Sequence, residues 1–289
     1  MKKSATLKFM VMAMFVAMFC VSLTSCGSDG DNDDTATGGD NISDVTGENK
    51  DDANNLMKGL REIYSETTYL GGSKDVMFQN PEYDKQGRLT YYEIHNEFDF
   101  DFYIRYEYQK DKIIFTSSGF YKGGEVYHNE KITYTLEKGL ITSYQYSSDD
   151  KPCSIKYDDK SRIVQIGDNR FFSWNSAGDL YEGKYGGLMV CKYMSSLAQM
   201  PAIWESSTSL VDACFHLDLF LLMQGYFGKS IPVHNLKSWD DYIQGNLDNL
   251  FEKCYYTYSF DSKGRCIKQT LNDEMSGNKT TTVYTLKWE

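Results

Sequence analysis

Few residues of this 289-residue chain have types and spacings that could perform acid–base chemistry. His216 stands four residues after Asp212 and two before Asp218, so an acid–base pair could form on one face of a predicted helix. The chain has no Gly-x-Ser-x-Gly, His-Glu-x-x-His or Gly-x-Gly-x-x-Gly pattern and no Walker loop. We therefore interpret Asp212 and His216 as a structural pair on that helix.

A second arrangement that could do chemistry is the carboxylate pair Asp99 and Asp101. On one face of a strand these groups would lie roughly 7 Å apart along the chain, a separation that glycoside hydrolases use. Alternating acids are also common on the water-facing side of a strand, and we favour that interpretation. We predict no catalytic residue, and a hydrolase is the least favoured of the functions considered.

Four acids near the N-terminus have the ligand spacing of a calcium loop: Asp29, Asp31, Asp33 and Asp40. The sixth position of that loop is Asp34, where the sharp turn needs glycine. The twelfth is aspartate, which is shorter than the usual bidentate glutamate. We therefore predict a solvated acidic segment and no calcium site.

Five cysteines follow residue 26: Cys153, Cys191, Cys214, Cys254 and Cys266. Their number is odd and none has Cys-x-x-Cys spacing, so we predict no zinc site and no other metal or cofactor. Several fall at apolar positions, where cysteine packs as a small hydrophobe. Their disulfide state stays open.

The N-terminus is typical of an exported lipoprotein. Basic residues precede the apolar run from Phe9 to Val21, which is shorter than the roughly 20 residues a membrane-spanning helix needs. The tetrapeptide Leu23–Cys26 resembles a bacterial lipobox, in which the cysteine thiol carries the lipid. We predict a signal peptide over residues 1–25 and lipidation of Cys26, which gives a stable anchor because several acyl chains share one residue.

The charge is distributed unevenly along the chain. The net charge is −11, and residues 26–55 alone carry nine acids against one lysine. That segment has no aromatic residue, so we predict a disordered tether over 26–55. With no basic cluster to offset the acids, nucleic acid is excluded as a partner.

Residues 56–289 are dominated by a two-residue period. From Phe98 to Tyr108, aromatic and aliphatic residues alternate with polar ones, which predicts a long strand with one apolar face. All 23 tyrosines of the chain lie in this region. We predict one β domain over 56–289.

A short motif recurs between the predicted strands. It is Tyr83-Asp84-Lys85-Gln86-Gly87-Arg88-Leu89, and the other two close copies start at Tyr157 and Phe260. Looser copies start at Trp174, Leu136 and Tyr108. In this motif an aromatic residue ends a strand, and an aspartate or asparagine side chain caps a turn. Glycine takes the left-handed position, and an apolar residue begins the next strand two places later.

These hairpins resemble YD repeats, the units of RHS-type shells. The whole arrangement over about residues 56–289 is similar to a family of Bacteroidetes lipoproteins of unknown function, described as having a porin-like β fold. The turn Gly225–Gly228 adds to that resemblance, and Gly27–Asp34 resembles the acidic export signal of lipoproteins from that group. The copies at Tyr108 and Leu136 depart from the pattern because they lack the Tyr-Asp pair. The resemblance implies a fold and an outer-membrane, cell-surface location, but no chemistry.

A segment at about 195–252 loses the two-residue period. Leu210, Cys214, Leu217, Phe220 and Leu221 recur at helical spacing, and so do Trp239, Ile243, Leu247, Leu250 and Phe251. We predict a two-helix insert, with Ser238 or Asp240 as the cap of the second helix. The favoured role is a plug over an open end of the sheet, and the alternative is a lid or floor of a ligand pocket.

The sequence thus predicts a mainly β fold, an antiparallel meander of repeated hairpins that is strongly curved or barrel-like, with a two-helix insert. The predicted function is a lipid-anchored surface protein without enzymatic activity that binds a glycan or a protein, or acts as a scaffold. The alternative is an outer-membrane β-barrel pore. Glu and Lys on both strand faces argue against the pore, because a lipid-facing band is uncharged.

Overall fold

The structure is a computed structural model of the 289-residue chain. Every described residue belongs to the unit formed by residues 45–289. The described ranges are 56–68, 73–95, 100–121, 123–184, 187–197, 203–204, 208–209, 218–243, 250–275 and 278–289. The predicted signal peptide, the predicted tether with its acidic loop, and Cys26 lie outside the described residues.

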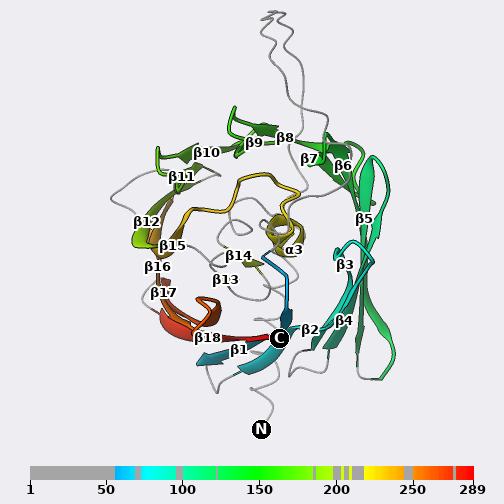
Figure 1. The fold of residues 1–289 in the computed structure, drawn as a ribbon, viewed down its shortest axis with the longest axis horizontal. Coiled ribbons are helices and arrows are strands. Elements are labelled where there is room, and N and C mark those ends of the chain that lie inside the picture. The colour runs from blue at the N-terminus through cyan, green and yellow to red at the C-terminus, as the bar shows by residue number, and fades with distance from the viewer. Residues whose placement is uncertain are drawn as a thin grey trace, which may run out of the picture. The chain divides into compact units, whose positions relative to one another are not determined.

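Sixteen antiparallel strands form a closed barrel (Figure 1). Each strand pairs with the next along the chain, except that β12 pairs with β15, and β18 pairs with β1 to close the ring. The strands are β1 (Leu60–Thr68), β2 (Ser73–Tyr83), β3 (Leu89–His95), β4 (Phe100–Tyr108), β5 (Lys112–Tyr121), β6 (Val126–Glu137), β7 (Leu140–Tyr146), β8 (Cys153–Tyr157), β9 (Ile163–Ile166), β10 (Arg170–Trp174), β11 (Leu180–Lys184), β12 (Gly187–Leu197), β15 (His234–Ile243), β16 (Leu250–Phe260), β17 (Cys266–Met275) and β18 (Asn278–Trp288). The predicted hairpin meander is therefore confirmed, and its sheet closes.

The inner face of the wall is mostly apolar. On β4, the buried Ile104 and Tyr106 alternate with the exposed Arg105 and Glu107, which confirms the two-residue period for the described part of this strand. Inward side chains from around the ring form one hydrophobic cluster. Since alternate residues of a strand point to opposite faces, the polar residues between them face outward.

The recurring motif builds its turn as predicted. In the copy at Tyr157, the backbone amides of Lys160 and Arg162 donate to Oδ1 of Asp158 at 3.0 and 2.8 Å, and Ser161 takes a φ of +61°. The Arg162 guanidinium donates to Oδ2 of Asp158 at 2.7 Å, a role that the sequence pattern had not suggested. Burial alone would raise the pKa of Asp158, but the hydrogen bonds and charge from Arg162 hold it below its usual value. The same bonds recur at Asp84 with Arg88 and at Asp261 with Arg265.

The aromatic residue of the motif connects neighbouring hairpins. Tyr108 Oη donates to the Leu89 carbonyl at 2.8 Å, and Trp174 Nε1 donates to the Ile163 carbonyl at 2.7 Å. In each case the acceptor is the apolar residue that begins the strand after the preceding motif. The same link joins Tyr193 to Leu180 and Trp288 to Cys266. Tyr258 donates in a similar way to the carbonyl of Leu236, which follows no copy of the motif. These hydrogen bonds connect neighbouring hairpins at the end of the barrel where the turns of the motif lie.

A short helix, α3 (Leu219–Met223), lies inside the ring of strands (Figure 1). Asp218 caps it, because its Oδ1 accepts from the amides of Phe220 and Leu221, each at 2.9 Å. Tyr106 of β4 donates to the other oxygen of Asp218 at 2.6 Å. All five residues of α3 are buried, so the helix is part of the core.

The residues after α3 bind the backbone at the turn end of the barrel. The amides of Leu89, Ile141 and Ile163 donate to Gln224 Oε1, the Tyr226 carbonyl and Ser230 Oγ at 3.0, 2.9 and 2.9 Å. Leu89 and Ile163 are the first residues of β3 and β9, and Ile141 is the second residue of β7. Residues 218–234, which we call the plug, therefore close this end.

The predicted two-helix insert is only partly correct. Phe220 and Leu221 do lie in a helix, but it has only five residues, and Leu210, Cys214 and Leu217 lie outside the described residues. The second predicted helix is wrong, because Trp239 and Ile243 belong to β15, and Leu250 and Phe251 begin β16. Both strands complete the barrel wall, so Ser238 and Asp240 are strand residues and cap no helix.

The outer face of the wall carries ion pairs on several strands. Ion pairs join Lys74 to Glu66 at 3.3 Å, Lys287 to Glu62 at 2.8 Å, Lys279 to Glu274 at 3.3 Å, Lys184 to Glu182 at 3.2 Å and Lys192 to Asp240 at 3.3 Å. The five pairs lie on β1, β2, β11, β12, β15, β17 and β18. Ion pairs of this kind on a protein surface contribute little to stability. Within the described residues, no helix is long and apolar enough to cross a membrane.

Candidate metal centre

Most of the residues that the sequence singled out for chemistry cannot be placed. Asp99, Asp212, Cys214 and His216 lie outside the described residues. Asp218 is described, and it serves as the cap of α3. Asp101 lies on the outer face of β4 and pairs with His95 of β3. The structure thus leaves both predicted acid pairs untested.

Four of the five cysteines after Cys26 are described, and each is a free thiol. Cys191, Cys254 and Cys266 are buried, and Cys153 is half-buried. Burial raises the pKa of Cys266 to about 11, so this thiol stays protonated at neutral pH. Most of these cysteines behave as the small hydrophobes predicted, but Cys254 has polar neighbours.

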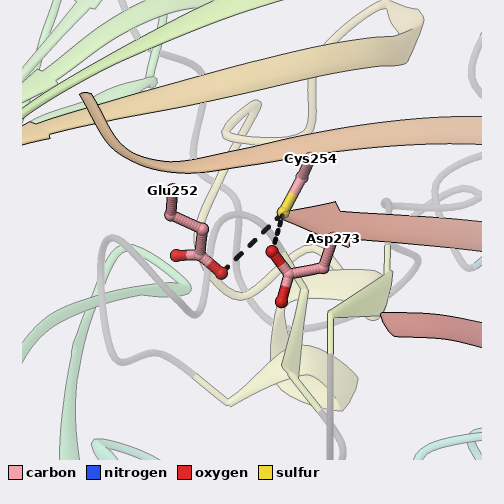
Figure 2. Close-up of side chains that lie close together, drawn as sticks. All are labelled: Glu252, Cys254 and Asp273. Atoms are coloured by element: carbon pink, nitrogen blue, oxygen red, sulfur yellow. Dashed lines mark hydrogen bonds between the residues drawn. The ribbon is translucent and has the colours of Figure 1, made fainter. Parts of the chain in front are cut away.

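Glu252, Cys254 and Asp273 converge on the inner wall (Figure 2). Cys254 Sγ lies 3.9 Å from Glu252 Oε1 and 3.6 Å from Asp273 Oδ1. The carboxylate and sulfur atoms that could bind a metal all lie within 4.8 Å of one another. Glu252 and Cys254 are buried and Asp273 is half-buried. We call these three residues the thiol–carboxylate cluster.

Two adjacent strands hold the cluster. Glu252 and Cys254 are two residues apart on β16 and therefore share a face, and Cys254 pairs directly with Asp273 on β17. On the other side of β16, Trp239 pairs with Cys254 and Asp241 pairs with Glu252. The cluster thus has an aromatic neighbour, Trp239, and a further carboxylate, Asp241, on the adjacent strand β15.

Burial dominates the electrostatics of these acids. It raises the pKa of Asp273, although hydrogen bonds with Glu252 and Cys254 act in the opposite direction. Burial also raises the pKa of Asp241, against the effect of a hydrogen bond from the backbone of Tyr242. Neither Asp241 nor Asp273 forms an ion pair with a basic residue in the described part of the chain.

Sequence reasoning missed the cluster because it searched for close spacing along the chain. Cys254 and Asp273 are distant in sequence and meet only through the register of the β16–β17 hairpin. One signal in the sequence could have indicated the cluster. Glu252 and Cys254 stand at alternate positions of a strand, on the face that is expected to be apolar. A polar residue on the core face of a strand is the exception that needs an explanation.

A second polar network lies on the outer face of β2, β3 and β4. His95 is hydrogen-bonded between Asp101 and Glu93, and Glu93 also accepts from Asn80 at 2.9 Å and from Tyr91 at 2.8 Å. Burial lowers the pKa of His95, but the two carboxylates raise it by more. Beside this network is a shallow groove of about 280 Å³, lined by Glu82, Thr90, Arg105, Tyr106, Glu107, Ile114 and Thr116.

Comparison with known proteins supports the fold and no more. A crystal structure of a porin-like protein from Bacteroides uniformis aligns with a TM-score of 0.50 and 12% identity, covering 80% of this chain and 96% of that one. A porin-like protein from Bacteroides vulgatus aligns with a TM-score of 0.30 and 9% identity, covering 80% of this chain and 98% of that one. No protein-family model matches the sequence, and no curated protein does. The chain has a fold like that of the porin-like protein from Bacteroides uniformis, and its class is a closed antiparallel β-barrel.

Proposed function

We propose that this protein is an exported lipoprotein, anchored through Cys26 to the outer membrane and displayed at the cell surface, where the barrel stands in water and binds a partner. The observation that carries this proposal is the polarity of the wall. A barrel embedded in lipid has an uncharged, apolar outer band and a polar interior. Here the ion pairs lie outside and the hydrophobic cluster lies inside.

The same observation argues against the pore. A conducting barrel needs a polar, water-filled lumen, whereas this one contains α3 and the aromatic side chains that pack around it. Other parts of the sequence supply the membrane attachment: the lipobox ending at Cys26 and the acidic segment 26–55 that follows it. In this proposal the YD-like repeats form the hairpins of a barrel at the cell surface.

A binding or scaffolding role is the activity that these features support best. The groove beside Arg105 and the network around His95 place hydroxyl, carboxylate and guanidinium groups on the water-facing side of β2–β5. Such groups, with the ring of Tyr91 under Arg105 at 4.5 Å, suit a glycan or a polar protein surface. The proposed role is binding or scaffolding without catalytic turnover.

The Cys26→Ala variant tests the anchor. In cells that process lipoproteins, the wild-type protein should incorporate labelled palmitate and remain in the membrane pellet after an alkaline carbonate wash. The variant should lose the label and appear in the supernatant, because a water-facing wall offers lipid no apolar band. Cys153→Ala serves as the matched control, since it removes a different thiol and should behave like wild type. An unlabelled wild-type protein, or a variant that stays in the pellet, would refute the proposal.

A further inference from the structure

The thiol–carboxylate cluster combines donors of two chemical kinds on one rigid wall. Among the described residues, it is the only group of three or more His, Cys, Asp or Glu residues whose donor atoms lie this close together. The thiol is a soft donor and the carboxylates are hard ones. A divalent ion of intermediate softness is the ligand that accepts both.

We propose that Glu252, Cys254 and Asp273 bind one divalent metal ion of the zinc class on the inner wall of the barrel. Zinc accepts cysteine sulfur and carboxylate oxygen in one tetrahedral site. Calcium and magnesium take oxygen ligands and do not use a thiolate. Three protein donors leave the fourth position for water or for a ligand group.

Two of the three distances between the donors are close to those around such an ion. With zinc–sulfur and zinc–oxygen bonds of usual length, a tetrahedral site holds sulfur and oxygen about 3.6 Å apart. The two Sγ–O separations in the cluster are 3.6 Å, to Asp273, and 3.9 Å, to Glu252. Since Cys254 and Asp273 face each other across the β16–β17 ladder, backbone hydrogen bonds fix this spacing.

The charge around the cluster also favours a cation. Asp241 faces the same side of the wall, directly opposite Glu252. In the described part of the chain neither Asp241 nor Asp273 has a basic partner. Two half-buried acids of this kind, Asp241 and Asp273, are costly unless protons or a metal ion neutralise them. The competing arrangement is therefore an acid pair that shares a proton beside an inert thiol.

Zinc titration of the purified protein separates the two arrangements. The chelator-stripped protein is titrated with Zn²⁺ against a chromophoric competitor, and bound zinc is counted by elemental analysis after dialysis. We expect one site per chain that Asp273→Asn and Cys254→Ser each weaken by more than about 10-fold, since loss of an outer-shell contact alone has that effect. Cobalt should give a thiolate charge-transfer band in the wild type that is lost in Cys254→Ser.

The matched control is Cys266→Ser, which removes another buried thiol on β17 and should leave zinc affinity unchanged. Every variant retains the acids of residues 26–55, so weak binding there cancels in the comparison. Circular dichroism shows whether each variant folds. If Cys254→Ser does not fold, the nearly isosteric Asp273→Asn still tests the proposal. A wild type without a site, or an Asp273→Asn variant that binds zinc as tightly, would overturn the proposal. Either result would leave the lipid anchor unaffected.

Discussion

Replacing Gly228 by alanine is expected to destabilise the barrel by about 2–5 kcal/mol. Gly228 has a φ of +64°, where any residue with a Cβ is strained, and its Cβ would overlap the backbone oxygen of Ser161. That oxygen accepts a hydrogen bond from the Lys229 amide at 2.8 Å. Neither backbone can therefore move away without breaking the contact between the plug and the turn of the Tyr157 motif.

Gly225 provides the matched control within the same turn. It also has a positive φ, of +79°, but a Cβ there would meet nothing within 4 Å. Gly225→Ala should therefore cost only the conformational strain, about 1–2 kcal/mol. Urea unfolding followed by circular dichroism measures both variants. If Gly225→Ala and Gly228→Ala had equal free energies of unfolding, the backbone of the plug at Gly228 would not lie in close contact with Ser161.

Phe220→Ala is expected to cost about 3–5 kcal/mol of unfolding free energy. The Phe220 side chain is 2% exposed, and its ring lies 4.8 Å from that of Phe78 and 4.6 Å from that of Tyr92. Truncation would leave a cavity at the contact between α3 and the wall. That cavity cannot collapse easily, because hydrogen-bonded strands hold the wall on every side.

Phe171→Ala removes the same side chain from the outer face. Phe171 of β10 is 47% exposed, so its loss should change stability by no more than about 0.5 kcal/mol. Chemical denaturation gives the free energy of unfolding of both variants. Because each replaces phenylalanine by alanine, the two values differ only through the burial of the side chain. If Phe220→Ala lost no more stability than Phe171→Ala, α3 would not belong to the cooperative core.

The sequence predicted the strands well because their inner residues are apolar over most of the ring. The alternation through Ile104 and Tyr106 is of this kind, and the capped turn at Asp158 follows from side-chain chemistry that is local in sequence. The prediction failed at β15, where Asp241 occupies an inward position and interrupts the apolar alternation. Without that regularity, the spacing of Trp239 and Ile243 matched a helical period.

Other features of the fold form only when the barrel closes, and no short stretch of the sequence indicates them. The bond from Trp174 to the Ile163 carbonyl joins neighbouring hairpins, and the plug reaches strand starts far away along the chain. The thiol–carboxylate cluster depends on the β16–β17 register, which an irregularity between Ser259 and Phe260 shifts by a residue. The sequence shows the residue types in such a cluster, but it does not show that their side chains lie close together in the fold.

The central claim is that the barrel has a water-facing wall around an apolar, plugged interior. Its most direct test is purification, without any detergent, of the mature chain that starts at residue 26 and carries Cys26→Ala. We expect a monodisperse protein with a β-sheet circular dichroism spectrum and a cooperative unfolding transition in plain buffer. A chain that aggregates in buffer and acquires that spectrum only in detergent micelles would contradict the account, because its outer wall would then require lipid.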